Sequence, residues 1–344
     1  MKIGFFKLEE WEREYIKKSG LEKSGAELVF IDDILSHEHL PTGQAGLPTA
    51  RDFDAVSVFV DSIVNAEVLA ALPNLKFVTA RSTGYDNIDV AACRARGIQV
   101  SYVPSYGENT VAEFAFALIL ALSRKIYDGF DRIRESGSFS LTGLRGFDLK
   151  GRTLGVVGTG RIGRHVVRMA QGFEMEVVAY DTHADLKYAA EAGIKYLPLE
   201  ELLQVSDIVT LHVPHLPETH HLMNAERLAL MKPAALLINT ARGGVVETEA
   251  LVAALKNGRL GGAGLDVLEE EGVIRDELDF LAHGHPEEHN LKTILADHIL
   301  IDLPNVIVTP HNAFNTTEAL VRILDTTIEN IRGFLVGKGV NLVP

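Results

Sequence analysis

Short apolar runs alternate with stretches of helical length along most of the chain. The runs are rich in Val, Ile, Leu and Phe and are bounded by charged residues, Gly or Pro, as buried strands are. They predict strands at 2–6, 27–31, 55–60, 75–80, 153–158, 176–181, 208–213, 235–240, 262–267 and 306–309. Helical patterns lie between them, at 11–19, 161–171, 184–192 and 317–335. This alternation predicts an α/β protein whose parallel sheets carry helices on their faces.

Two segments depart from this alternation of strand and helix patterns. Residues 40–50 are small, uncharged and rich in Pro and Gly, which predicts an exposed loop. Residues 109–126 predict a long helix with a cap at Asn109 or Thr110 and Glu113 in its first turn. That helix is apolar around most of its circumference, so we expect it to be buried on several sides. It is either a core helix or one shared between domains or subunits.

Composition and charge narrow the class of protein. The length of 344 residues suggests two domains. The net charge of -14 repels phosphate backbones, so we expect no nucleic-acid partner. Cys93 is the single cysteine, which rules out a disulfide within the chain. Early charges exclude a signal-peptide core, and the longest apolar stretch, 111–122, is too short to span a membrane. These features predict a soluble, cytoplasmic protein with no membrane partner.

A glycine motif predicts a dinucleotide site. Residues 158–163 read Gly-Thr-Gly-Arg-Ile-Gly, directly after a predicted strand and at the start of a predicted helix. Gly158 permits the tight turn, Gly160 lets the backbone approach a pyrophosphate, and Gly163 lets helix and strand pack closely. Asp181 ends the next strand, where its carboxylate can bind ribose hydroxyls and repel a 2′-phosphate. This favours NAD over NADP; the alternative is an ordinary glycine turn followed by an unrelated Asp.

Three later segments, 239–244, 266–271 and 309–314, place polar residues after predicted strands. Ligands in open α/β sheets bind beyond these carboxyl ends. Arg242 offers a planar cationic fork for a carboxylate, and His311 is a plausible proton donor. A Glu from 269–271 could pair with His311 and favour its protonated form. Taken singly, these residues could instead be a surface ion pair, a turn residue and a solvated loop.

In this order, the motifs resemble the D-isomer-specific 2-hydroxyacid dehydrogenases over nearly the whole chain. The resemblance includes Arg-Ser-Thr-Gly-Tyr-Asp-Asn-Ile-Asp at 81–89, the glycine motif, Leu-His-Val-Pro at 211–214 and the three later segments. Val-Pro-Ser-Tyr at 103–106 and the His-x-Ala-Phe-x-Thr pattern at 311–316 are most similar to the D-lactate dehydrogenase branch. Asn315 departs from that branch, which often has an aromatic residue there.

The resemblance implies a role for each matching residue. Arg242, Glu271 and His311 would be catalytic, with Glu271 chosen because the family's acid lies five positions after the strand-end Asp266. The backbone of Thr83 and Gly84 and the hydroxyl of Tyr106 would contact the substrate together with Arg242. The implied NAD contacts are Gly158, Gly160, Arg161, Ile162, Gly163, Asp181, Val213, Pro214, Thr219, Thr240, Ala241 and Asp266.

The resemblance also implies a domain plan. Residues 1–106 and 311–344 would form a discontinuous flavodoxin-like substrate domain, and residues 107–310 a Rossmann NAD-binding domain inserted into it. The 109–126 helix region would help to build a homodimer. The segments 40–50 and 272–303 match no motif.

We therefore expect NAD-dependent reduction of a small 2-oxo acid, first of all pyruvate, to the D-2-hydroxy acid. The alternatives are a relative that acts on an aromatic 2-oxo acid, phosphoglycerate or phosphite, and a non-catalytic NAD-sensing protein with the same fold. His283, His285 and His289 could form a metal site, but a solvated loop is favoured and no metal is predicted.

Overall fold

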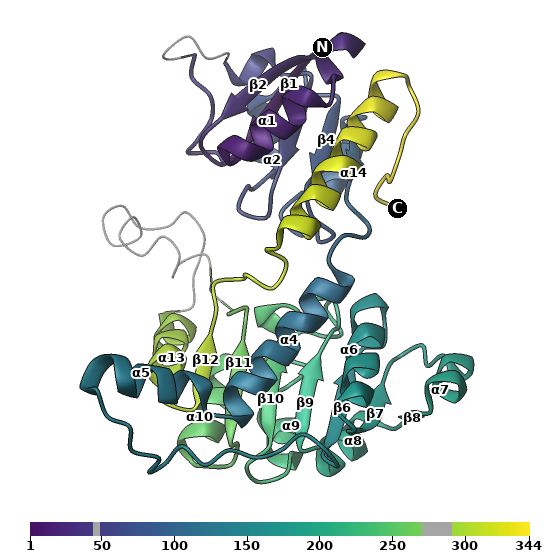
Figure 1. The fold of residues 1–344 in the computed structure, drawn as a ribbon. Helices are drawn as coiled ribbons and strands as arrows, with labels where there is room; N and C mark the ends of the chain where they lie inside the picture. Colours follow the sequence, from purple (N-terminus) through teal and green to yellow (C-terminus); the bar gives the residue numbers. More distant parts are fainter. Residues whose placement is uncertain (44–48, 270, 272–290) are drawn as a thin grey trace. The chain divides into compact units, whose positions relative to one another are not determined.

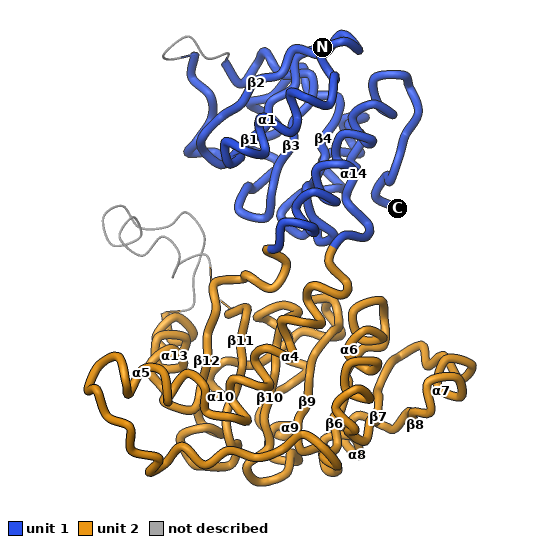
Figure 2. Tube along the Cα trace, in the orientation of Figure 1, with its two compact units in different colours: residues 1–106, 316–344 blue, residues 107–315 orange. Residues whose placement is uncertain are grey.

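The computed structural model describes residues 1–43, 49–269, 271 and 291–344. These residues form two compact units (Figure 2): unit 1 contains 1–106 and 316–344, and unit 2 contains 107–315. The chain returns to unit 1 at Thr316, later than the expected boundary at 311, so that His311 is part of unit 2.

Unit 1 is built on a parallel five-stranded sheet in the order β2-β1-β3-β4-β5. This is the flavodoxin-like order. The strands are β1 (Lys2–Phe6), β2 (Glu27–Ile31), β3 (Ala55–Val58), β4 (Phe77–Ala80) and β5 (Gln99–Ser101). The helices are α1 (Glu10–Lys18), α2 (Ala66–Ala71), α3 (Val90–Ala95) and α14 (Thr317–Leu335).

Alternate side chains of the unit 1 strands build a core on each face of the sheet. Ile3 and Phe5 of β1 pack with Ile16 of α1 and with Leu324 of α14. Phe6, the next residue of β1, belongs instead to the core that contains residues of α2 and α3. The sheet is therefore covered on both faces, as the near-continuous apolar strands require.

Unit 2 is built on a seven-stranded sheet in the order β12-β11-β10-β9-β6-β7-β8, with all neighbouring strands parallel. This is the Rossmann order, with one strand added at an edge. The strands are β6 (Thr153–Val157), β7 (Glu176–Tyr180), β8 (Lys195–Tyr196), β9 (Ile208–Leu211), β10 (Leu236–Asn239), β11 (Gly262–Leu265) and β12 (Val306–Val308).

Helices cover both faces of the unit 2 sheet (Figure 1). One core includes residues of α4 (Glu108–Ser123), α6 (Arg161–Gly172) and α7 (Leu186–Ala192). The other includes residues of α8 (Leu199–Val205), α9 (Ala225–Leu230), α10 (Thr248–Lys256) and α13 (Leu291–Asp302). Among the described residues of unit 2 there is one more α-helix, α5, which spans Ile126–Ser136. The predicted fold class, two doubly wound parallel-sheet domains, is confirmed.

The expected start of the long helix was wrong. α4 begins at Glu108 and its cap residue is Gly107, whose carbonyl accepts the Val111 N–H at 2.8 Å. Asn109 is already inside the helix and donates to Glu113 at 3.1 Å, so neither Asn109 nor Thr110 caps it, and Glu113 lies beyond the first turn. The helix ends at Ser123, because Lys125 adopts a left-handed backbone (φ 54°) before α5.

α4 is a core helix of unit 2. Leu118 and Leu122 lie against Gly264 of β11, where a Cβ would stand only 3.0 Å from Leu118 Cβ. The small residues of β11 thus allow the helix to approach the sheet. The expectation that this helix is buried on several sides is confirmed, and its packing favours the core-helix interpretation.

The two segments without a motif are only partly described. Thr42, Gly43 and Thr49 are exposed, as expected for a loop, but Ala50 is buried at the start of a tight helical turn. Residues 44–48 and 272–290 lie outside the described residues, and so do His283, His285 and His289. Residues 291–302 form α13, which the sequence pattern missed. None of the described helices has both the length and the apolar character that crossing a membrane requires.

Candidate active site

The predicted cofactor and acid–base residues of unit 2 follow the carboxyl ends of parallel strands. Gly158 follows β6, Asp181 follows β7, Thr240 follows β10, Asp266 follows β11 and His311 follows β12. Because these strands are parallel, their carboxyl ends lie along one edge of the sheet (Figure 1). That edge is where α/β sheets bind ligands.

The glycine turn between β6 and α6 requires glycine at two positions for steric reasons. Gly158 has a φ of +94°, and a Cβ there would lie 2.6 Å from the His212 carbonyl oxygen. A Cβ on Gly163 would lie 2.0 Å from the Gly158 carbonyl oxygen. At Gly160, by contrast, a Cβ would meet no atom of the described residues within 4 Å.

Gly160 is the cap residue of α6, so its open side lies at the positive end of a helix dipole. The first N–H groups of a helix have no partner within the helix and can bind phosphate oxygens. Arg161, the first residue of α6, forms an ion pair with Glu108 at 3.7 Å. The turn therefore fits the pyrophosphate of a dinucleotide.

Asp181 is half-buried and held in place by the glycine turn. One carboxylate oxygen accepts hydrogen bonds from the Thr159 N–H at 2.8 Å and the Thr159 hydroxyl at 2.9 Å, and the other accepts the His183 N–H at 2.9 Å. Burial would raise the pKa of Asp181, but these hydrogen bonds outweigh it and lower the pKa. An ionised carboxylate thus stands beside the glycine turn, as ribose binding requires.

Two buried polar atoms near the cofactor-binding edge have no hydrogen-bond partner within the described residues. One is the hydroxyl oxygen of Thr240, at the end of β10, and the other is Nδ1 of His212, beside the glycine turn. Burial lowers the pKa of His212 to about 3, so its ring is neutral, and Nε2 lies 2.9 Å from the Thr210 hydroxyl. Buried polar groups normally have hydrogen-bond partners. Thr240 therefore fits a ligand-contacting position.

The loop after β9 is folded around Thr219. Its hydroxyl donates to the Pro214 carbonyl at 2.6 Å and accepts the Leu216 N–H at 2.8 Å. Pro214 and Thr219 were both expected to contact NAD, and this turn brings them together. Val213 lies against the glycine turn, since a Cβ on Gly158 would come within 2.9 Å of its side chain.

His311 and Glu271 form a direct pair. His311 Nδ1 lies 2.9 Å from Glu271 Oε1, and their side chains are 18% and 36% exposed. Glu269 instead faces His221 and Thr248, and Glu270 lies outside the described residues. Of the two described acids in the 269–271 run, Glu271 is the one that faces His311. Because Nδ1 of His311 faces Glu271, Nε2 of the same ring is left for proton exchange.

Asp266 holds the loop that carries His311. One of its oxygens accepts the Thr309 hydroxyl at 2.6 Å and the Asn312 N–H at 2.8 Å, and the other accepts the Ala313 N–H at 2.8 Å. The Asp266 carbonyl accepts the His311 N–H at 2.8 Å, and His311 has a left-handed backbone (φ 50°). Burial raises the pKa of Asp266 despite these bonds. Asp266 therefore positions His311, a contribution that the sequence did not indicate.

Arg242 lies on a loop that Asn239 closes. The Asn239 side chain donates to the Arg242 carbonyl at 2.9 Å and accepts the Ala241 N–H at 3.0 Å. Arg242 is partly buried, and its guanidinium donates to the Ala241 carbonyl at 2.7 Å. A Cβ on the following Gly243 would lie 2.0 Å from the Leu268 carbonyl oxygen, so this loop lies against the one after β11.

The predicted substrate contacts in unit 1 also follow strand ends. Thr83 and Gly84 follow β4, and Tyr106 follows β5. The Thr83 hydroxyl donates to the Val103 carbonyl at 2.8 Å, and the Ser82 hydroxyl donates to the Gly84 carbonyl at 2.6 Å. The turn that presents Thr83 and Gly84 is thereby tied to the chain beyond β5.

Arg81, the first residue of the 81–89 motif, is a structural residue. It is buried, and its guanidinium donates to the carbonyls of Ser57 and Phe6 at 2.9 and 2.7 Å. Burial lowers the pKa of Arg81 to about 10. It therefore links β4 to the ends of β3 and β1.

Comparison with known proteins agrees with this arrangement. The model of the NAD binding domain of the D-isomer specific 2-hydroxyacid dehydrogenases matches residues 116–313, more than half of the chain. The chain belongs to this family. It is an NAD-dependent D-2-hydroxyacid dehydrogenase, and NAD is its cofactor.

Relatives within the family cover nearly the whole chain. A 2-hydroxyacid dehydrogenase homolog of Zymomonas mobilis is 38% identical over 98% of this chain and 98% of its own length. A glyoxylate reductase of Korarchaeum cryptofilum is 37% identical over 94% of this chain and 91% of its own length. The structure of D-lactate dehydrogenase from Aquifex aeolicus, complexed with NAD and lactic acid, matches this chain with a TM-score of 0.83. The two sequences are 34% identical, and the match covers 97% of this chain and 96% of that one. D-2-hydroxyacid dehydrogenases of differing substrate are thus similar to this chain.

One cluster of ligating side chains was not predicted from the sequence. His220 and His221 lie on the loop after β9 with one ligand atom each close to Glu269, and His215 of the same loop contacts His220. The available signal was the adjacent His220-His221 pair in this loop. It gave no indication that Glu269, far along the chain, would lie next to it.

Proposed function

We propose that this dehydrogenase reduces a small 2-oxo acid, with pyruvate as the preferred substrate, to the D-2-hydroxy acid. The observation that carries the proposal is the His311–Glu271 pair at 2.9 Å, on the edge of the sheet that also carries the glycine turn and Arg242. A proton donor, a carboxylate-binding group and a nucleotide site on one edge are what reduction of an oxo acid needs.

When bound, NADH supplies the hydride that adds to the substrate carbonyl carbon. The residues proposed to hold NAD are Gly158, Gly160, Arg161, Ile162, Gly163, Asp181, Val213, Pro214, Thr219, Thr240, Ala241 and Asp266. Gly160 would admit the pyrophosphate, Asp181 would bind the ribose hydroxyls, and the unpartnered Thr240 hydroxyl would gain a partner.

His311 is proposed to give its proton to the carbonyl oxygen in reduction and to take one from the hydroxyl in oxidation. Glu271 would hold the His311 ring in place through its contact with Nδ1, and Asp266 would hold the loop that carries His311. Arg242 would bind the carboxylate and stabilise the negative charge that develops on the carbonyl oxygen. Thr83, Gly84 and Tyr106 are proposed as the remaining substrate contacts.

Pyruvate is favoured by the likeness to an enzyme whose structure contains lactic acid. The likeness to a glyoxylate reductase makes glyoxylate the second candidate. The test is kcat/KM for NADH-dependent reduction of pyruvate, glyoxylate, hydroxypyruvate, oxaloacetate and phenylpyruvate. We expect the highest value with pyruvate. A higher value with another acid would overturn the pyruvate assignment, and NADH binding without turnover of any of them would favour the NAD-sensing alternative.

We further propose a homodimer, with α5 in place of α4 as the central contact. α4 packs within unit 2, whereas Ile126, Tyr127 and Phe130 of α5 are 57%, 58% and 59% exposed. Beyond α5, Phe139 and Leu141 are 84% and 83% exposed. So many large apolar side chains exposed in one segment mark a surface for another chain. A second copy is the occupant that the family resemblance favours.

A further inference from the structure

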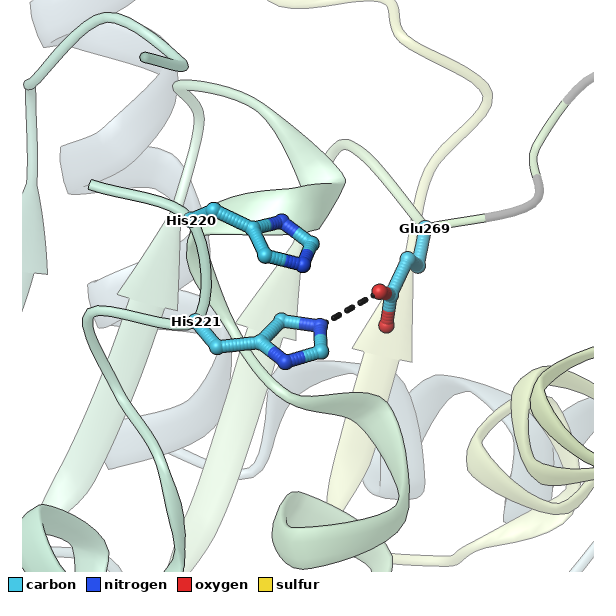
Figure 3. Close-up of side chains that lie close together, drawn as sticks. All are labelled: His220, His221 and Glu269. Atoms are coloured by element: carbon cyan, nitrogen blue, oxygen red, sulfur yellow. Dashed lines mark hydrogen bonds and ion pairs between the residues drawn. The ribbon is translucent and has the colours of Figure 1, made fainter. Parts of the chain in front are cut away.

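Three side chains on the loops after β9 and β11 form a compact set of ligating groups. One ligand atom each from His220, His221 and Glu269 lie within 4.8 Å of one another (Figure 3). The two imidazoles are stacked with their centroids 3.8 Å apart, and His221 Nε2 lies 2.6 Å from Glu269 Oε1. In Figure 3 both rings are turned toward the side on which Glu269 lies. No metal was predicted from the sequence, and the one candidate cluster in the sequence, at 283–289, is a different segment.

The neighbouring residues hold two of these three groups in position. The second oxygen of Glu269 accepts the Thr248 hydroxyl at 2.9 Å, which leaves the first oxygen directed at His221. The His221 N–H donates to the Gly244 carbonyl at 2.8 Å, and His221 has a left-handed backbone (φ 50°). The positions of Glu269 and His221 are therefore set by the fold rather than by chance contact of mobile side chains.

A fourth residue orients the exposed ring. His215 Nε2 lies 3.2 Å from His220 Nδ1, so that Nε2 of His220 is the nitrogen left to face Glu269. Metal-ligating histidines commonly use their second nitrogen in such a contact, which fixes the tautomer and the orientation of the ring. His215 lies directly beside Gly244, where a Cβ would come within 2.8 Å of its Nε2.

We propose that His220, His221 and Glu269 bind a divalent transition-metal ion of the Zn²⁺ class. Two imidazoles and one carboxylate are a known ligand set for tetrahedral Zn²⁺, with the fourth position open to water or another ligand. Ligand atoms at about 2.0–2.1 Å from such an ion lie roughly 3.4 Å apart. To meet this geometry the exposed His220 ring has to move inward by about 1 Å, and the distance between His221 Nε2 and Glu269 Oε1 has to open from 2.6 Å to roughly 3.4 Å.

The bound ion takes the place of the direct contact between His221 Nε2 and Glu269 Oε1. It links the loop after β9 to the loop after β11, which the Glu269–Thr248 contact already connects to the start of α10. The proposal is independent of the substrate and of the acid–base assignment, since none of its ligands is among the residues assigned to the reaction. An ion there stabilises the folded chain by mass action.

The test is calorimetric titration of Zn²⁺ into untagged, chelator-treated protein, with Co²⁺ absorption in the visible range as a second readout. We compare the native chain with His220→Ala and Glu269→Gln. His37→Ala, an exposed histidine of unit 1, is the matched control. A variant with His283, His285 and His289 all changed to Ala removes the competing cluster.

We expect Zn²⁺ binding that weakens by about tenfold or more in His220→Ala and in Glu269→Gln. The His37→Ala variant and the triple variant should retain the His220-dependent binding. Because His220 is exposed, its loss leaves the fold intact; thermal unfolding checks this for Glu269→Gln. Absence of Zn²⁺ binding by the native chain, or binding that survives His220→Ala and disappears in the triple variant, would overturn the proposal.

Discussion

Asp181 shows how one side chain can set the choice of cofactor. Its carboxylate is kept ionised by hydrogen bonds from Thr159 and His183, and it stands beside the glycine turn. We predict a clear preference for NADH over NADPH. Asp181→Ala should narrow the gap by removing both the ribose contacts and the repulsion of a 2′-phosphate. The measurement is kcat/KM with each cofactor. Equal values for NADH and NADPH in the native enzyme would contradict the role assigned to Asp181.

Glu271 and His311 form a pair at the same scale, with His311 Nδ1 2.9 Å from Glu271 Oε1. Glu271→Gln keeps the size of the side chain but removes the carboxylate charge that faces the ring. Because Glu271 is proposed to orient the proton donor, we predict that kcat/KM for the oxo acid falls by about tenfold or more. The affinity for NADH should change little, and fluorescence titration checks it. A variant with native kcat/KM would show that Glu271 is not the partner.

Single residues were predictable where the chemistry is local to a strand end. Gly158, Asp181, Arg242 and His311 each follow a strand, so the pattern marked all four as candidates. The family resemblance then supplied the roles expected of Arg242 and His311. The choice among the acids at 269–271 came from the family's spacing, because adjacent residues of one loop point in different directions. The role of Asp266 beneath His311 depends on backbone N–H groups whose directions no sequence pattern reports.

At the scale of elements, two glycines of the turn between β6 and α6 are expected to have different roles. Gly163 allows α6 to pack on β6, whereas Gly160 leaves room for a ligand. Gly163→Ala places a Cβ 2.0 Å from the Gly158 carbonyl and must push α6 away from β6. We predict destabilisation of about 1–3 kcal/mol in a denaturation experiment. Gly160→Ala meets open space in the described residues, so its stability should stay within about 0.5 kcal/mol of the native value.

Gly160→Ala should nevertheless weaken NADH binding by about tenfold or more, because the new methyl group blocks the approach of the pyrophosphate to the backbone. Fluorescence titration of NADH measures this beside the stability data. Tight NADH binding by Gly160→Ala would contradict the proposed pyrophosphate site. A fully stable Gly163→Ala would contradict the tight packing of α6 on β6.

Elements with clearly bounded patterns were predicted most closely. β1, β2 and α14 have the expected limits, since each has an uninterrupted apolar or amphipathic run. β5 and β8 were missed because three and two residues carry too little pattern. The start of α4 was misplaced because Gly107 caps it without a side chain, while the polar Asn109 next to it offered a more usual signal.

For the whole molecule, we predict a dimer that depends on α5. Phe130→Glu places a charge in the exposed apolar surface and should yield monomers in size-exclusion chromatography with light scattering. Leu186→Glu is the matched control. Leu186 belongs to α7 and is 74% exposed, and α7 lies at the opposite end of the unit 2 sheet from α5 (Figure 1), so that variant should remain dimeric. A monomeric native enzyme, or a Phe130→Glu variant that stays dimeric, would contradict the α5 surface.

The parallel sheets were predictable from the alternation of strands and helices. The flavodoxin-like and Rossmann plans, whose strand orders the structure has, came from the family resemblance. The cluster of His220, His221 and Glu269 did not follow, since it joins loops that are 48 residues apart in sequence. Such a site depends on tertiary packing, and neither spacing nor composition reveals it.

The central claim is that His311 transfers the proton while a 2-oxo acid is reduced to the D product. Its most direct test is NADH consumption with pyruvate by the native enzyme and by His311→Ala, with chiral analysis of the lactate formed. We predict only D-lactate from the native enzyme, and a loss of about 10²–10⁴-fold in the rate of reduction for His311→Ala. L-lactate or a racemic product, or a His311→Ala variant that keeps most of its activity, would contradict the account.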